Sequence, residues 1–246
     1  IFKLVGGEHR SGGLAGPPLP LLNSIAPTFR RAPAQCTMLT HELVPAGEAD
    51  SKWLMVVLHG LGDSMEGYRW LPAALNLPWL NYLLVNAPDD YHGGFSWYDF
   101  EDDPAPGVKR SRVALFELLD AQRESGFPTG QTFQFGFSQG CLITMEVAMR
   151  YPHQLAGCIG ISGYVHEPEQ AVRELSPEAM NQAILFTLGT FDPIIPVEKV
   201  KGQLNQLRQD GGLQIESREF AKDHTIAGEE ELSFIRDFLS AQRQAL

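Results

Sequence analysis

Gly136-Phe137-Ser138-Gln139-Gly140 is the stretch of this 246-residue chain that decides the fold. It lies between an apolar segment of strand length, 132–135, and an apolar-periodic segment typical of a helix, 141–151. A serine at such a strand–turn–helix junction occupies a strained backbone conformation, and its hydroxyl projects outward. The flanking glycines have no Cβ to collide with the strand and the helix. Because the five-residue pattern alone is weak evidence, a nucleophilic role for Ser138 depends on what the rest of the chain supplies.

Apolar segments of strand length alternate with amphipathic segments of helix length from residue 39 onward. The expected strands are 39–44, 53–58, 82–85, 132–135, 155–161, 184–188 and 213–220, and the expected helices are 64–75, 108–124, 141–151, 197–208 and 229–244. We expect an aromatic-rich loop at 89–107 and a polar excursion with one short helix at 162–182. The alternation predicts an α/β fold with a mostly parallel central sheet, helices on both faces and no large cap domain.

Composition limits the kind of protein. Hydrophobic residues make up 43% of the chain, which is ordinary for a globular domain, and no segment approaches the ~18 continuous apolar residues of a membrane span. The net charge of −11 argues against a nucleic-acid partner. The three cysteines, Cys36, Cys141 and Cys158, form no C-x-x-C pattern and no disulfide framework, which favours a cytoplasmic location.

Residues 1–37 stand apart from this pattern because they are rich in Gly and Pro and show little periodicity. They lack the apolar run and cleavage site of a signal peptide. We expect them to be a flexible extension, either artificial or processed, and we expect residues 38–246 to form one catalytic domain.

A serine nucleophile needs a base that takes its proton and an acid that orients the base. In this fold class the chain order is Ser, acid, His. Among the seven histidines, His224 is the expected base, because it follows the last expected strand. Asp192, in the loop after strand 184–188, is the expected acid. Asp223 is a poorer candidate because neighbours in an extended segment point apart, and Glu198, in the following helix, is weaker too.

Two backbone N–H groups should stabilise the negative oxygen that forms during attack. Gln139 begins the helix after Ser138 and supplies one, and Leu61 in the stretch His59-Gly60-Leu61-Gly62-Asp63 is the expected second. The same stretch begins like a dinucleotide-binding fingerprint, but Met65 stands where the third glycine belongs. With no Walker pattern and no second metal ligand near His59, we expect no cofactor and no metal ion.

Several motifs, taken together and in order, resemble the phospholipase/carboxylesterase family of α/β-hydrolases, which includes small bacterial carboxylesterases and acyl-protein thioesterases. They are His-Gly-Leu-Gly-Asp at 59–63, Asn-Ala-Pro at 86–88, Ser-Trp-Tyr-Asp at 96–99, Gly-Phe-Ser-Gln-Gly at 136–140, Phe-Asp-Pro-Ile-Ile-Pro at 191–196, and His224 followed by Glu-Glu at 229–230. The resemblance implies one α/β-hydrolase domain without a cofactor, which hydrolyses acyl esters or thioesters.

The resemblance also implies roles for particular residues. Ser138, Asp192 and His224 would form the triad, Leu61 and Gln139 the oxyanion hole, and Trp97 and Ile194 part of the acyl site. The chain departs from the family at Leu188, where a His is frequent, and at Asp223, where a Gly is frequent. Neither departure removes a triad member.

The sequence therefore predicts a serine carboxylesterase that hydrolyses short- to medium-chain acyl esters through an acyl-enzyme intermediate. An acyl-protein thioesterase or a lysophospholipase would use the same triad and is the alternative reading. A non-catalytic binding protein with this fold is a third, disfavoured because such proteins usually lose a triad residue. The expected partner is a small acyl ester or thioester, and a homodimer is left open.

Overall fold

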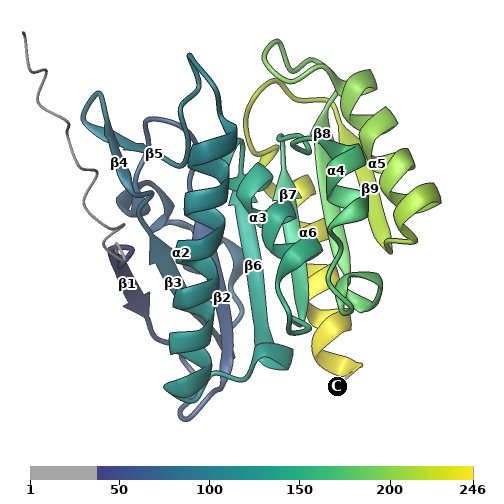
Figure 1. Cartoon of the computed structure of the whole chain (residues 1–246). Helices are drawn as coiled ribbons and strands as arrows, with labels where there is room; N and C mark the ends of the chain where they lie inside the picture. The colour runs from purple at the N-terminus through teal and green to yellow at the C-terminus, as the bar shows by residue number, and fades with distance from the viewer. Residues whose placement is uncertain (1–37, 246) are drawn as a thin grey trace, which may run out of the picture. The chain divides into compact units, whose positions relative to one another are not determined.

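A seven-stranded sheet forms the centre of the computed structural model, which describes residues 38–245. The sheet order is β1-β3-β2-β6-β7-β8-β9 (Figure 1). Its strands are β1 (His41–Val44), β2 (Trp53–Leu58), β3 (Leu80–Val85), β6 (Thr132–Phe137), β7 (Gly157–Ile161), β8 (Ile184–Gly189) and β9 (Ile215–Phe220). In this sheet, as the structure describes it over residues 38–245, only the edge strand β1 runs antiparallel to its neighbour. The predicted mostly parallel sheet is confirmed, while the prediction for residues 1–37 lies outside the described part of the chain.

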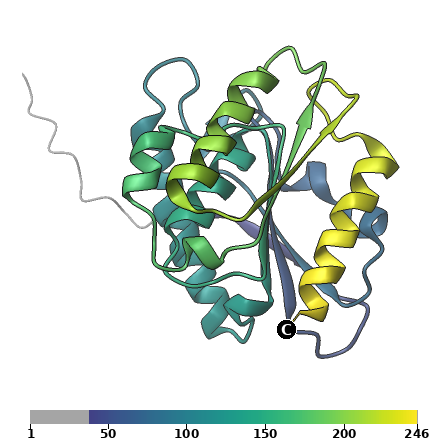
Figure 2. The same ribbon diagram turned by 90° about the vertical axis from the view of Figure 1, so that its right-hand side faces the viewer.

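Helices cover both faces of this sheet (Figure 2). One face carries α2 (Ala105–Glu124), α3 (Gln139–Arg150), α4 (Pro168–Arg173) and α5 (Val197–Gly211), and the other carries the 3₁₀ helix η1 (Met65–Tyr68), α1 (Leu71–Leu75) and α6 (Gly228–Gln244). Two short 3₁₀ turns, η2 (Thr129–Gln131) and η3 (Ala179–Asn181), complete the described helices. Alternate residues of β2 serve the two layers, since Val56 packs with the α3 side and Val57 with the α6 side.

The expected helix over 64–75 is wrong. The chain forms η1, breaks, and then forms α1 with Pro72 in its first turn. Pro72 has no N–H to donate to an earlier turn, so it suits the first turn of a new helix and would interrupt a continuous helix from Ser64.

The expected loop over 89–107 contains a small hairpin of β4 (Asp89–Tyr91) and β5 (Gly94–Ser96). Its two turn residues, His92 and Gly93, both have positive φ, which is the conformation that tight hairpin turns require. The hairpin bonds to the end of the loop 59–63, because Gly62 N–H donates to the Phe95 carbonyl at 2.9 Å and Phe95 N–H donates to the Asp63 carbonyl at 2.9 Å.

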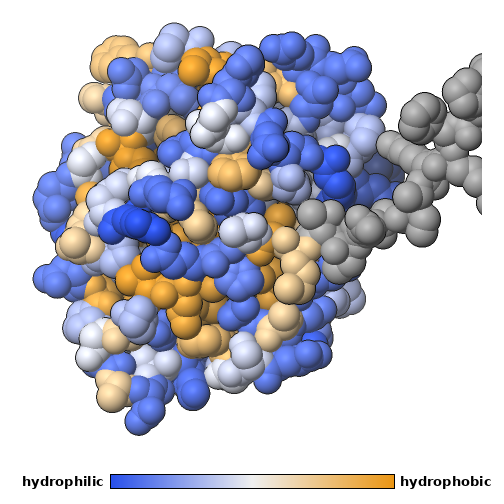
Figure 3. All heavy atoms as spheres, turned by 90° about the vertical axis from the view of Figure 1, so that its left-hand side faces the viewer, coloured by the Kyte–Doolittle hydropathy of each residue, from blue (hydrophilic) through white to orange (hydrophobic). Residues whose placement is uncertain are grey.

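Figure 3 views the side of the molecule on which β1 lies, where polar and charged residues surround an apolar patch. Leu43 of β1 is among the exposed apolar side chains of the protein. None of the helices described in residues 38–245 has the length and apolar character that crossing a membrane requires.

Candidate active site

Ser138 lies in a sharp turn between β6 and α3, with φ 54° and ψ −114°. This left-handed φ is costly for a residue with a side chain and marks a locally strained backbone. A Cβ on Gly136 would collide with the carbonyl of Gly140, and a Cβ on Gly140 would lie 2.5 Å from the carbonyl oxygen of Leu58. The two glycines therefore allow the strand, the turn and the helix to pack as closely as they do.

Three side chains from three loops meet in a continuous hydrogen-bonded chain. The Ser138 hydroxyl donates to His224 Nε2 at 2.9 Å, and His224 Nδ1 donates to Asp192 Oδ2 at 2.7 Å. The Asp192 side chain is 1% exposed and that of His224 is 16% exposed. The carboxylate fixes the imidazole tautomer, so the unprotonated Nε2 faces the serine.

The Asp192 carboxylate is itself held in place. Its Oδ1 accepts the N–H groups of Ile194 and Ile195, each at 2.9 Å. Burial works against ionisation of this carboxyl, but the bonds from these N–H groups and from His224 outweigh burial and keep the pKa of Asp192 below its usual range. The group is therefore a carboxylate at neutral pH.

The two other candidates for the acid lie elsewhere. Asp223 is exposed, and His224 Nδ1 bonds to Asp192 instead. Glu198 is 80% exposed on α5, where it pairs with Lys201 at 3.1 Å.

Two backbone N–H groups border the cavity in front of Ser138. Gln139 is the first residue of α3, so its N–H has no partner inside the helix, and Leu61 follows β2 in the adjoining loop. Neither N–H donates to another group within residues 38–245. Leu61 and Gln139 thus line the same cavity as Ser138.

Side chains behind the cavity hold these two N–H groups in place. His59 Nδ1 donates to the Gly60 carbonyl at 2.6 Å, and its Nε2 accepts the N–H of Ala87 at 3.0 Å. Burial lowers the pKa of His59, and this arrangement requires the neutral ring. The Gln139 side chain accepts the Trp97 N–H at 3.0 Å and donates to the Tyr98 carbonyl at 3.1 Å.

Trp97 does not line the cavity. Its side chain is completely buried, its indole N–H donates to the His59 carbonyl at 2.9 Å, and its ring lies 5.5 Å from that of His59. The structure places Trp97 under the loop 59–63, where it supports the loop and does not face the cavity. The reason is the chain direction at 96–98, where Gln139 anchors the backbone and turns the neighbouring Tyr98 toward the cavity.

The cavity in front of Ser138 has a volume of about 560 Å³. Ile194 lines it, as the sequence predicts. Tyr98, Phe100, Tyr164 and Ile195 line it as well, and sequence analysis did not assign them. Only their place in loops after strands could have indicated them. Apolar and aromatic walls around a polar reacting centre are typical of a site for an acyl group.

A second hollow of about 410 Å³ adjoins the first and shares Asp63 and Phe137 with it. Thr225 and Ile226, which follow His224 directly, form part of its wall, and the ring of Phe137 lies 5.1 Å from that of His224. The imidazole therefore lies where the two hollows meet. Within the described residues, no group of three or more His, Cys, Asp or Glu side chains could hold a metal ion.

A strained serine in the turn between the parallel strand β6 and α3, bonded to a histidine in the loop after the last strand of the sheet, is the arrangement that defines the α/β-hydrolase class. Comparison with known proteins gives the particular group. The chain belongs to the phospholipase/carboxylesterase family, whose model matches residues 39–243.

Relatives within this family carry two kinds of name. The chain is 32% identical over 189 residues to "Acyl-protein thioesterase 1" of Schizosaccharomyces pombe, covering 71% of this chain and 84% of that protein. It is 28% identical over 232 residues to "Probable carboxylesterase Os04g0669500" of Oryza sativa subsp. japonica, covering 84% and 86%. The solved structure of esterase PE8 is similar, with a TM-score of 0.72, 26% identity, and coverage of 82% of this chain and 98% of that chain.

Proposed function

We propose that this protein is a serine carboxylesterase that hydrolyses short- to medium-chain acyl esters, with Ser138, His224 and Asp192 as its triad. The observation that carries the proposal is the chain of hydrogen bonds from the Ser138 hydroxyl through His224 to Asp192, at 2.9 and 2.7 Å, beside an apolar cavity. A serine that reacts needs a base within about 2.6–3.2 Å of its oxygen, and His224 Nε2 meets this condition.

The proposed reaction has two steps. His224 Nε2 takes the Ser138 proton as Oγ attacks the acyl carbon, while the N–H groups of Leu61 and Gln139 donate to the oxygen that becomes negative. His224 then gives the proton to the departing alcohol oxygen, and the C–O bond breaks to leave an acyl-enzyme. The same imidazole then takes a proton from water as the water oxygen attacks the acyl carbon. The bond from this carbon to Ser138 Oγ breaks, Oγ receives the proton from His224, and the carboxylic acid leaves.

The acyl part of the substrate fits the cavity of about 560 Å³. Phe100 and Ile194 at its border are 59% and 56% exposed, and an acyl chain that covered them would remove apolar surface from water. Its walls are mostly aromatic and aliphatic, with Asp63 as an acidic residue among them, and this lining favours an uncharged acyl chain.

The leaving alcohol fits the second hollow. The atom that accepts a proton from His224 must lie beside Nε2, and the acyl and alcohol parts extend in opposite directions from the reacting carbon. Phe137 and Thr225, next to this imidazole, line the second hollow, and Trp70 lines it as well. We therefore assign this hollow of about 410 Å³ to the alcohol half of the ester.

A second candidate is an acyl-protein thioesterase, favoured by the name of the Schizosaccharomyces pombe relative. A thioester differs only in the leaving atom, so the same triad would serve, and a lysophospholipase would use it too. Acyl-chain length and the leaving atom therefore separate these activities, and the triad does not.

The test compares wild type with Ser138→Ala on p-nitrophenyl esters and matching thioesters whose acyl chains run from acetyl to palmitoyl. We expect ester turnover by wild type, highest for short to medium chains, and loss of roughly 10⁴-fold or more in kcat for the variant. Ester turnover that survives in Ser138→Ala contradicts the proposal. A wild type fastest on palmitoyl thioesters supports the thioesterase instead, and a wild type that fails to react with a fluorophosphonate supports a non-catalytic protein.

A further inference from the structure

A buried ion pair lies directly beneath the loop that carries His224. Lys222 Nζ is 2.6 Å from Glu231 Oε1, and the two side chains are 2% and 0% exposed. Neither residue takes part in the proposed reaction. Because removing two charges from water costs about as much as their attraction returns, a buried pair of this kind is weak evidence for a contribution to stability alone.

Glu231 holds the loop on both sides of His224. It lies in the first turn of α6, and its second oxygen, Oε2, accepts the N–H of Ala227 at 2.5 Å. One carboxylate thus binds the side chain two residues before His224 and the backbone three residues after it. Glu231 therefore connects the beginning and the end of the loop between β9 and α6.

Lys222 links the same loop to the loop of Asp192. Its carbonyl accepts the N–H of Phe191 at 3.0 Å, and its own N–H donates to the Phe220 carbonyl at 2.8 Å. A Cβ on Gly189 would lie 2.7 Å from the Lys222 carbonyl oxygen, so the end of β8 packs directly against this backbone. A shift of Lys222 would therefore disturb the residue next to Asp192.

The Glu231 carboxylate is the main charge that stabilises the ammonium group in this position. Burial lowers the pKa of Lys222, while the Glu231 carboxylate, and at longer range Asp192, oppose this effect. The Lys222 ammonium also lies 6.0 Å from the centre of the Phe220 ring. Loss of Glu231 would leave the ammonium buried with no bonded counter-charge, which is costly.

We infer that Lys222 and Glu231 are positioning residues for His224: the pair holds both ends of the His224 loop on α6, connects it to the Asp192 loop, and so keeps the imidazole in line between Ser138 and Asp192. This inference rests on the proposed triad. A 1 Å displacement of a catalytic group is enough to cost about 10²-fold in rate, so a loosened loop lowers kcat even when the substrate still binds.

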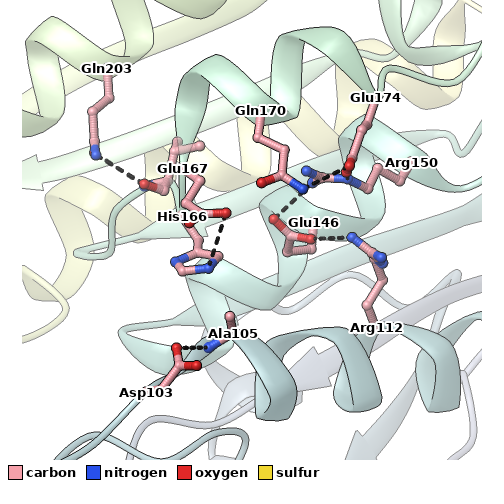
Figure 4. A network of polar contacts seen from close by, with 11 residues as sticks. Asp103, Ala105, Arg112, Glu146, Arg150, His166, Glu167, Gln170, Glu174 and Gln203 are labelled. Carbon is pink, nitrogen blue, oxygen red and sulfur yellow. Dashed lines mark hydrogen bonds and ion pairs between the residues drawn. The ribbon is translucent and has the colours of Figure 1, made fainter.

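The protein contains a matched control. Glu146 of α3 is also a buried acid, 2% exposed, and it bonds to Arg112 and Arg150 at 2.8 Å each. Figure 4 shows this network between α2, α3 and the segment around α4, and none of its members lines the cavity of Ser138. Glu146→Gln therefore breaks an ion pair of the same kind without touching the His224 loop.

The experiment measures kcat, KM and thermal unfolding for wild type, Lys222→Met/Glu231→Gln, Glu231→Asp and Glu146→Gln, at a temperature where all are folded. The double variant removes both charges, so no unpaired ammonium is left in the interior. We expect its kcat to fall about tenfold or more with KM changed less than about threefold. Glu231→Asp keeps the charge on a shorter side chain and should lose about threefold in kcat, whereas Glu146→Gln should lose stability and keep kcat.

Wild-type kcat in both Glu231 variants overturns the inference, and so does an equal loss of kcat in Glu146→Gln. If the double variant does not fold, Glu231→Asp decides the matter alone. A failure of the proposed function is a different result, because wild type itself would then neither turn over esters nor react with a fluorophosphonate.

Discussion

Replacing Asp192 by Asn tests the proposed triad at the residue that does not touch the substrate. In the wild type, Oδ2 accepts the Nδ1–H of His224, while Oδ1 accepts the N–H groups of Ile194 and Ile195. An Asn side chain has only one oxygen. If that oxygen keeps the two backbone N–H groups, its NH₂ group faces His224 Nδ1, which must then lose its proton.

The expected magnitude follows from the tautomer. With Nδ1 unprotonated, the proton of a neutral imidazole resides on Nε2, 2.9 Å from the Ser138 oxygen, and this nitrogen can no longer accept the serine proton. The imidazolium that forms in the reaction also loses its carboxylate partner. We expect kcat to fall by about 10⁴-fold, the effect of this change in a serine protease triad. That corresponds to about 5 kcal/mol of transition-state stabilisation.

The assay is steady-state hydrolysis of p-nitrophenyl butyrate, with thermal unfolding to show that the variant is folded. Asp223→Asn is the matched control, since Asp223 is an exposed carboxylate one residue before His224 and is expected to keep kcat within about twofold. An Asp192→Asn enzyme with kcat within about tenfold of wild type would refute the assignment. Loss of activity in Asp223→Asn instead would transfer the role of the acid to that residue.

Two further expectations concern the support of the site and its second hollow. Burial lowers the pKa of His59, so below about pH 6.5 the unfolded chain binds a proton that the folded protein does not, and the free energy of unfolding should decrease by up to about 1.4 kcal/mol for each unit by which pH is lowered. Urea titrations at pH 7 and pH 5 should show a smaller decrease in His59→Gln than in wild type, and equal decreases would contradict a neutral buried His59. Trp70→Ala should lower kcat/KM about three- to tenfold for esters of bulky aromatic alcohols and leave the preference for acyl-chain length unchanged. A changed preference for acyl-chain length would instead place the acyl group in the second hollow.

The elbow, the alternation of strands and helices along the chain, and the three side chains proposed as the triad could be predicted because their signals are local or depend on chain order. Gly136 and Gly140 flank a serine where apolar periodicity changes from strand to helix, and proximity in sequence is enough to recognise this turn. The rule for chain order then selects Asp192 and His224 without knowledge of distances. The structure brings the three together, and their catalytic roles stay a prediction for the assays above.

The positions of side chains in loops could not be predicted, because loops have no periodicity that separates inside from outside. Trp97 and Tyr98 are neighbouring aromatic residues, yet Trp97 packs under the loop 59–63 and Tyr98 faces the cavity. The difference comes from a hydrogen bond between Trp97 and Gln139, 42 residues apart in the chain. Similarly, Pro72 divides a segment whose apolar pattern suggests one helix.

By itself, then, the sequence determined the α/β architecture, the strained serine turn and which residue types could form a triad, since each depends on local backbone preference and on order along the chain. Tertiary structure alone decided the lining of the cavity, the second hollow beside His224 and the pairing of Lys222 with Glu231. These features depend on which buried polar groups meet after the sheet has formed, and in a buried setting each such group must find its partner in space, whatever its distance in sequence.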